Sequence, residues 1–262
     1  MTATVHLTFL GTGTSFGVPQ IGCGCAVCRS TDPRDKRTRC GAVIETGSGT
    51  RLLIDTPPEL RLQLVAAGIT TVDAVLYTHE HADHLHGLDD VRLFPFMLGN
   101  PIPIYASEIV EARIRKVFDY AFEKRDLTHA GAVPSMQLRR VDDRPLEILG
   151  SVLTPIPLIH GPYCKVYGYR IGNVAYCTDT NRIEPSSLEL LEGLDVLVLD
   201  ALRPTKHATH FSVGEALDVI ERLGPKKAYL THLSHELDYM TFHRELPEHV
   251  ALAYDGLRIP LT

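Results

Sequence analysis

The residues of this chain with the most evident chemistry lie together at 78–84 (THEHADH). Three imidazoles and a carboxylate this close together suit zinc, manganese or iron(II), whereas the lack of a thiolate among them argues against an iron–sulfur cluster. His79 and His81 point to the same side of an extended segment, and Asp83 and His84 turn away as a helix begins. The loop therefore offers ligands to two adjacent metals; the alternative is a solvated polar loop.

Strands must position this loop. Residues 72–77 (VDAVLY) form an apolar, β-branched run that stops at the histidines, which is typical of a buried strand that ends in a site. Three further donors follow other apolar runs in the same way: His160, Asp179 and His232. Singly, each histidine is more often an ordinary loop residue and the aspartate a turn former. Their joint placement at strand ends favours one shared site.

A second cluster of possible ligands is formed by the cysteines at 23–28 (CGCAVC). Three thiols at this spacing in a cytosolic chain suggest a metal before a disulfide, and three free thiols in a loop are the alternative. Cys40 is near enough in sequence to replace one of the ligands. Cys164 and Cys177 are interpreted as isolated structural thiols.

Composition limits the class of protein and of partner. The chain has 262 residues, of which 44% are hydrophobic, and a net charge of -6, as in an ordinary globular protein. The acidic balance makes nucleic acid an unlikely partner and a small-molecule substrate the better expectation. Residues 1–6 lack a basic region followed by an apolar stretch, and no apolar run approaches the length of a membrane span. We therefore expect a cytoplasmic protein that does not bind a membrane.

The order of the expected elements predicts two sheets that pack face to face under outer helices. Strands are expected at 5–10, 42–46, 51–55, 102–105, 152–156, 167–171, 174–177, 194–200 and 228–231. Helices are expected at 57–68, from Leu85 onward, at 107–124 and at 212–223, the last with Ser212 and Glu215 as a capping box. Residues 107–145 are expected to be a helical and loop-like excursion, without a regular pattern after residue 125.

These motifs, in this order, resemble those of the metallo-β-lactamase superfamily. The resemblance implies an α/β (α+β) fold, a four-layer αβ/βα sandwich, for a single domain 1–262 with a dinuclear site. It assigns one metal to His79, His81 and His160, the other to Asp83, His84 and His232, and the bridge between them to Asp179. It also implies that Asp55, which ends an early strand, orients one of these ligands.

An aspartate at the bridging position is the pattern of phosphodiesterases, glyoxalases and lactonases in the superfamily, so β-lactam hydrolysis is disfavoured. The chain is most similar to the phosphoribosyl 1,2-cyclic phosphate phosphodiesterase family of the carbon–phosphorus lyase pathway, which shares the cysteine cluster and the ending at 231–235 (THLSH). That similarity implies a structural zinc in the loop 22–40, held by Cys23, Cys25, Cys28 and His235. A closed tetrahedral set of this kind leaves no open position for a substrate.

The activity implied by this resemblance is hydrolysis of a small, cyclic phosphodiester by a metal-bridging hydroxide, with Asp179 and Asp83 as catalytic residues and Zn, Mn or Fe as active-site metals. His210 is the expected proton donor, and His207 is the competing choice. Hydrolysis of a lactone or thioester is the alternative reaction. A tRNA 3′-end nuclease is less favoured, because the basic residues at 113–125 are interspersed with acids. Relatives often form dimers, so a homodimer is a further expectation.

Overall fold

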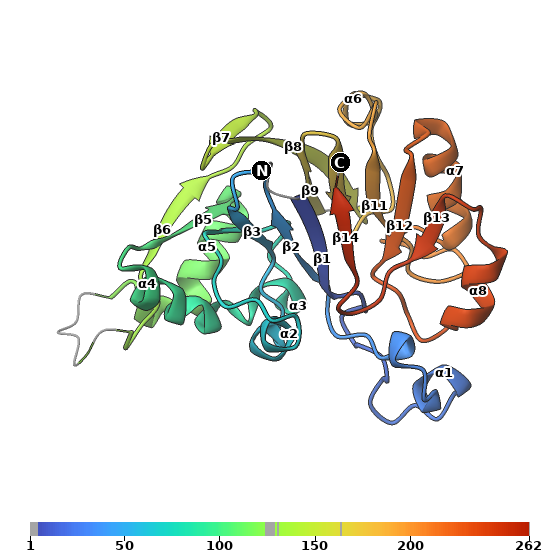
Figure 1. Ribbon diagram of the computed structural model, residues 1–262, viewed down its shortest axis with the longest axis horizontal. Coiled ribbons are helices and arrows are strands. Elements are labelled where there is room, and N and C mark those ends of the chain that lie inside the picture. The colour runs from blue at the N-terminus through green and yellow to red at the C-terminus, as the bar shows by residue number, and fades with distance from the viewer. Residues whose placement is uncertain (1–4, 124–128, 130, 163, 262) are drawn as a thin grey trace.

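Two sheets and the helices outside them make up the fold of the computed structural model, which describes residues 5–123, 129, 131–162 and 164–261 (Figure 1). The first seven-stranded sheet has the order β14 (Arg258–Leu261), β1 (Val5–Gly11), β2 (Gly41–Glu45), β3 (Arg51–Ile54), β4 (Ala74–Leu76), β5 (Ile102–Ala106) and β6 (Met136–Arg140). The second has the order β13 (Val250–Leu252), β12 (Lys227–Thr231), β11 (Val196–Asp200), β10 (Val174–Cys177), β9 (Cys164–Ile171), β8 (Ser151–His160) and β7 (Leu146–Ile148).

Helices cover the outer face of each sheet, except for α1 (Ala26–Arg29), which lies in the loop between β1 and β2 and away from the sheets (Figure 1). The first half contributes α1, α2 (Leu60–Ala66), α3 (Ala82–Leu85), α4 (Leu93–Leu98) and α5 (Glu108–Val117), with short 3-10 helices at Pro33–Asp35, Leu88–Arg92 and Asp119–Ala121. The second half contributes α6 (Pro185–Glu189), α7 (Val213–Leu223) and α8 (Tyr239–Glu245). None of the helices in the described part of the chain has the length and apolarity required to cross a membrane.

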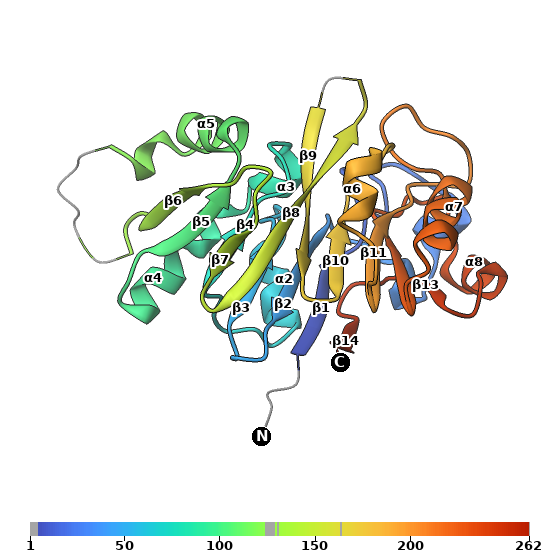
Figure 2. The ribbon, with the colours of Figure 1, turned by 90° about the horizontal axis from the view of Figure 1, so that it is seen from above.

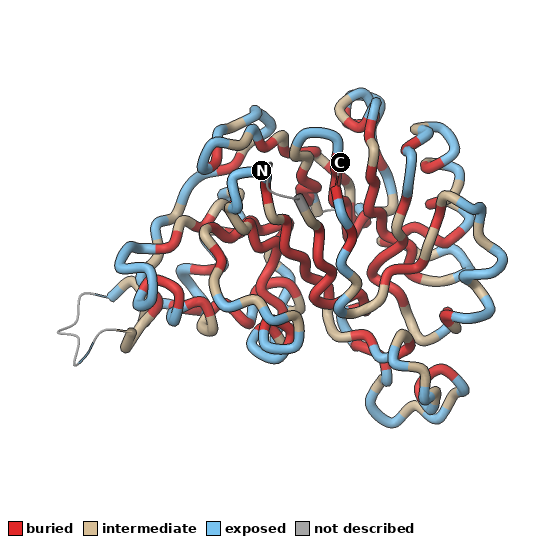
Figure 3. The backbone as a smooth tube through the Cα atoms, viewed as in Figure 1, coloured by how far each residue is buried: buried red, intermediate tan, exposed pale blue. Residues whose placement is uncertain are grey.

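The alternation of side chains along the central strands explains the layers. In β3, Leu52 and Ile54 face the core between the sheets, whereas Leu53 packs under the helices of the first half. In β11, Val198 faces the same central core and Leu197 packs under the helices of the second half. Both faces of these strands are buried, so their sequences are continuously apolar. Figure 3 shows the buried residues concentrated in the central strands, and the predicted four-layer αβ/βα sandwich is confirmed.

Parallel pairing brings several strand ends to one edge of the sandwich. In the first sheet β3, β4, β5 and β6 are parallel neighbours, and in the second β10, β11, β12 and β13 are (Figure 2). The carboxyl ends of parallel strands lie at the same edge of a sheet, where ligands commonly bind. The loops that follow β3, β4, β10, β11 and β12 therefore meet there.

The structure corrects several details of the sequence analysis. Residues 136–140 form β6, a strand of the first sheet, although no regular element is expected there. The expected helix from Leu85 is instead α3, which ends at that residue. Gly87 lies two residues beyond this end of α3, and a Cβ at this position would collide with the carbonyl oxygen of Pro57. Strands β13 and β14 were also missed, and the expected end of a helix at 124 lies outside the described residues.

Candidate metal centre

Three residues at this edge adopt a backbone conformation that non-glycine residues rarely use. Asp55, Asp179 and His232 have φ values of 62°, 55° and 59°. Aspartate and histidine tolerate this left-handed region better than most residues, and each instance still costs of order 1–3 kcal/mol. Each of the three follows a strand within two residues, at the ends of β3, β10 and β12. The sharp turns direct their side chains across the strand ends instead of along the sheet faces.

The seven residues predicted to bind two metals are brought together here. The rings of His79 and His81 have centroids 4.4 Å apart, and the ring of His160 lies 5.2 Å from that of His81. On the other side, Nε2 of His84 lies 3.3 Å from Oδ2 of Asp83 and 3.3 Å from Oδ2 of Asp179. The donor atoms of one loop thus face those of β8 and β10.

Asp179 lies between the two halves of the cluster. Its Oδ1 is 3.2 Å from Nε2 of His232 and 4.0 Å from Nε2 of His79. Two three-residue groups have ligand atoms that all lie within 4.8 Å of one another: His79, His81 and His160, and Asp83, His84 and His232. His79, His84 and Asp179 form a third such group. The carboxylate of Asp179 therefore lies close to ligand atoms of both three-residue groups.

Buried nitrogens without hydrogen-bond partners show that the cluster fits cations. Nε2 of His79, His84 and His232 is buried and has no hydrogen-bond partner among the described residues. Leaving a buried polar atom unpaired costs about 1–3 kcal/mol, so native proteins usually avoid it. Three such atoms that face carboxylate oxygens are explained by divalent cations as the missing partners.

Residues behind the cluster orient its imidazoles. Nδ1 of His84 lies 2.8 Å from Oδ2 of Asp55, and the backbone N–H of Thr78 donates to Oδ1 of Asp55 at 2.8 Å. The backbone carbonyl of Thr209 accepts from Nδ1 of His160 at 2.8 Å. A proton held on Nδ1 leaves Nε2 as the free lone pair for a metal, the usual arrangement around ligating histidines.

Electrostatics keep two of these histidines neutral in the absence of metal. Burial, reinforced by the neighbouring His84, lowers the pKa of His79 well below its ordinary value. Burial also lowers the pKa of His232 to about 4, because the nearby Asp179 carboxylate compensates only in part. Neutral imidazole is the form that binds a metal.

His210 lies against the cluster but has a different partner. Its Nδ1 is 2.8 Å from Oδ2 of Asp200, and its ring centroid is 4.7 Å from that of His160 and 4.6 Å from that of His232. Burial opposes a charge on His210, but the carboxylate of Asp200 outweighs this effect and raises the pKa to about 8. The competing candidate, His207, lies next to His210, with its ring centroid 5.3 Å from that of His210.

Asp200 is a candidate functional residue to which the sequence alone assigns no role. It is fully buried at the end of β11, and its Oδ2 also accepts from the backbone N–H of Thr180 at 2.9 Å. A carboxylate at the end of an otherwise apolar strand was the available signal, a position that Asp200 shares with Asp55.

The cysteine loop and His235 form a second cluster of possible metal ligands. Nδ1 of His235 lies 3.2 Å from Sγ of Cys23 and 3.6 Å from Sγ of both Cys25 and Cys28. A tetrahedral zinc with ordinary bond lengths separates a sulfur from a nitrogen ligand by roughly 3.5 Å, so the set fits zinc. Cys40 lies elsewhere, with its Sγ 3.5 Å from Oγ1 of Thr231, and does not replace a ligand of this group.

A mostly buried set of imidazoles and carboxylates at the strand ends of an αβ/βα sandwich defines a class of metal-binding hydrolases. Residues 50–233 match the model of the Beta-lactamase superfamily domain, and the chain belongs to that superfamily. The predicted superfamily is thereby confirmed, and divalent metal binding is a property of this fold.

Individual relatives support the same assignment. The crystal structure of a diphosphatase from the PhnP family has 42% sequence identity and a TM-score of 0.91, and the match covers 100% of this chain and 98% of that one. An octanoyltransferase of Porphyromonas gingivalis is 39% identical over 251 residues, which is 95% of this chain but 50% of the relative. This chain thus spans about half the length of that relative. Ribonuclease Z of Pyrobaculum aerophilum is 23% identical over 84% of this chain and 88% of its own length.

Proposed function

We propose that this protein is a metal-dependent phosphodiesterase that hydrolyses a small phosphodiester, including cyclic ones. The observation that carries the proposal is the contact of His210 with Asp200 beside the metal-ligand set. An alkoxide leaving group must be protonated as it departs, and a histidine held by a buried carboxylate can supply that proton. None of the seven predicted ligands can supply this proton, because each would be bound to a cation.

The donor set fits two divalent metals, and Zn, Mn and Fe all accept such donors. When bound, such metals polarise a phosphoryl oxygen and lower the pKa of water. His79, His81 and His160 would hold one of them, Asp83, His84 and His232 the other, and Asp179 both. Two divalent cations with two carboxylates leave a formal charge of about +2, which favours an anionic substrate over a neutral lactone.

Residues outside the metal-ligand set orient the imidazoles and transfer the proton. Asp200 fixes the ring of His210 through Nδ1, so Nε2 is the atom that faces outward to the leaving oxygen. Asp55 performs the corresponding function for His84. Both carboxylates are fully buried, which prevents water from competing for these hydrogen bonds.

A second candidate reaction is hydrolysis of a diphosphate link. The similarity to a diphosphatase, at 42% identity over the whole chain, favours it. The same donors serve this reaction, because it too transfers a phosphoryl group to water. The octanoyltransferase relative keeps an acyl thioester among the alternatives, together with a lactone.

A panel of substrates separates these reactions. Protein of measured metal content would be assayed with bis-p-nitrophenyl phosphate, adenosine 2′,3′-cyclic phosphate, ADP, a lactone series and an octanoyl thioester. We expect the highest kcat/KM for a phosphodiester, with Asp179→Asn as the inactive control for contaminating hydrolases. Turnover of a lactone or the thioester with no cleavage of any phosphorus substrate would refute the proposal.

The proposed setting and partners follow from the same residues. Cys23, Cys25 and Cys28 serve as zinc ligands only in the reduced form, so we propose the cytoplasm as the compartment. The proposed partners are the small substrate and, in a homodimer, a second copy of the chain. Light scattering of the purified zinc-loaded protein tests the dimer.

A further inference from the structure

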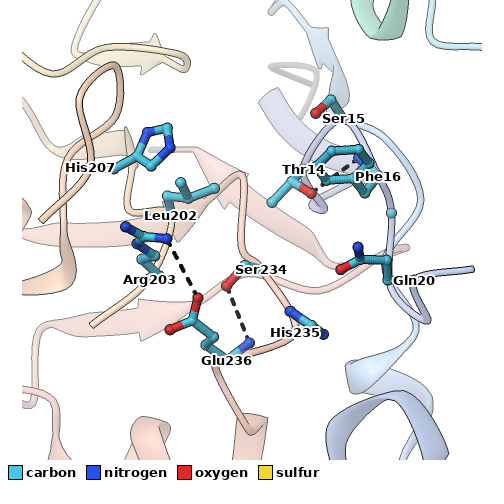
Figure 4. Close-up of a pocket in the computed structure, with 11 residues that line it drawn as sticks. Thr14, Ser15, Phe16, Gln20, Leu202, Arg203, His207, Ser234, His235 and Glu236 are labelled. Atoms are coloured by element: carbon cyan, nitrogen blue, oxygen red, sulfur yellow. Dashed lines mark hydrogen bonds and ion pairs between the residues drawn. The ribbon is translucent and has the colours of Figure 1, made fainter. Parts of the chain in front are cut away.

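A cavity of about 210 Å³ with no assigned occupant is lined by His207, the neighbour of His210, and by His235 of the cysteine cluster (Figure 4). Three loops form it: the turn after β1, the segment after β11 and the segment after β12. Phe16 and Gln20 line one side, and Leu202, Arg203 and His207 line the opposite side. Pockets for complete small ligands span ~300–1,000 Å³, so this cavity suits one part of a ligand, such as a single ring system.

The position of the cavity identifies which part of the substrate would enter it. Its wall includes His207, whose ring centroid is 5.3 Å from that of His210. His210 is the proposed proton donor to the leaving oxygen, so the group bonded to that oxygen lies on the His210 side of the metals. The cavity is therefore next to the leaving group.

Phe16 presents an aromatic ring from a hydrogen-bonded turn. The residue is 70% exposed, and its backbone N–H lies 3.2 Å from Oγ1 of Thr14. The backbone N–H of Gly17 donates to the carbonyl of Thr14 at 2.8 Å, and Gly17 has a φ of 65° that favours glycine. An exposed aromatic ring carried on such a turn is available to stack on a planar ligand.

The polar groups in the cavity suit the edge of a heterocycle. The side-chain amide of Gln20 makes no hydrogen bond to any described residue. The backbone nitrogen of Gln20 lies 3.3 Å from Sγ of Cys28, to which it donates. The zinc cluster thus positions a wall of the cavity that also offers a free donor and acceptor. The apolar Leu202 lies on the side opposite Phe16. A nucleobase fits this arrangement, because its planar faces can pack between apolar side chains while its polar edge faces an amide.

We propose that this cavity is a leaving-group subsite for a nucleobase, with Phe16 as the stacking residue and Gln20 as the residue that contacts the base edge. The inference rests on the proposed function and narrows its substrate class to phosphate esters and anhydrides of nucleosides. Base–aromatic stacking contributes about 1–3 kcal/mol per base, which corresponds to roughly 5- to 150-fold in affinity.

The test compares two ligands that differ only by the base. Calorimetric titration of the zinc-loaded protein with adenosine 5′-monophosphate and with ribose 5-phosphate measures the contribution of the ring. We expect the wild-type protein to bind the adenosine compound at least tenfold more tightly. Phe16→Ala should remove most of this difference and Phe16→Tyr should keep it, with zinc content and circular dichroism as checks of folding.

Turnover of adenosine 2′,3′-cyclic phosphate relative to glycerol 1,2-cyclic phosphate is the second readout. The ratio of the two kcat/KM values should fall at least tenfold in Phe16→Ala. Equal binding of the two monophosphates by the wild-type protein, or a preference that Phe16→Ala leaves intact, would overturn the subsite. A base preference that depends on Phe16, without hydrolysis of any phosphorus substrate, would support the subsite and refute the proposed function.

Discussion

Oδ2 of Asp200 lies 2.8 Å from Nδ1 of His210, while Oδ1 of the same carboxylate lies 3.8 Å from Nδ1 of His232. One buried side chain at the end of β11 therefore contacts the proposed proton donor and lies close to a predicted metal ligand. Oδ1 is buried without a hydrogen-bond partner among the described residues, as is Nδ1 of His232. A small approach of these two groups would orient His232 as Asp55 orients His84.

His210→Ala tests the role of the proton donor. We expect kcat to fall by about 10²–10⁴, the range for a lost general acid, while the metal content measured by mass spectrometry stays unchanged. His207→Ala is the matched comparison and should act mainly on KM, since His207 lines the neighbouring cavity. If His207→Ala abolishes turnover and His210→Ala does not, the two assignments must be exchanged.

Asp55→Asn tests the support of a metal ligand. The substitution keeps the shape of the side chain but weakens the hydrogen bond to His84, so metal affinity should fall roughly 10- to 100-fold. Competition with a chelator measures that affinity. Asp142→Asn is the control, because Asp142 forms an exposed ion pair with Arg144 at 2.6 Å; an equal loss of affinity in both variants would argue against a specific role.

Cys25→Ala tests the structural zinc. The zinc would join the loop 22–40 to the segment that carries His232, so its loss should lower stability and activity together. We expect Tm to fall by roughly 6–12 °C, which corresponds to about 3 kcal/mol for a chain of this size. Cys164→Ala serves as the control, since Cys164 lies outside the cluster. Full zinc content and an unchanged Tm in Cys25→Ala would contradict the assignment.

The capping box of α7 gives a pH-dependent prediction. Hydrogen bonds from the side chain and backbone of Ser212 lower the pKa of Glu215 below its ordinary value. A lowered carboxyl pKa means that the stabilisation is present above the unfolded-state pKa of about 4.3 and is lost as the pH falls through the folded-state value. In urea unfolding, Glu215→Ala should therefore be less stable than wild type at pH 6, and the difference should shrink below pH 4. A difference that grows on acidification would contradict this sign.

Local patterns were sufficient for the features that arise from neighbouring residues. The loop at 78–84 combines its ligands within one segment, and the capping box of Ser212 and Glu215 needs only four consecutive positions. Alternating and continuous apolar runs likewise determine strands that are buried on both faces. The two-sheet arrangement and the superfamily followed from the order of these motifs.

Features that depend on contacts distant in sequence were harder to predict. His235 meets Cys23 across 212 residues, and only the family resemblance, not the spacing, indicated this ligand. Asp200 acts on His210 through a turn that local patterns do not reveal. β6 carries mostly exposed and half-buried residues, so its pairing with β5 leaves no apolar pattern to detect. Spacing alone does not separate His207 from His210 as the proton donor, and the choice of His210 stays a prediction.

Hydrolysis of bis-p-nitrophenyl phosphate in water enriched in ¹⁸O tests the central claim, metal-dependent attack on phosphorus, most directly. Phosphorus-31 NMR of the p-nitrophenyl phosphate product should show one ¹⁸O bonded to phosphorus, formed at a rate that rises with the metal content of the dinuclear site. The account would be contradicted if no product formed in the fully metal-loaded protein, if the product lacked the label, or if its rate were independent of metal.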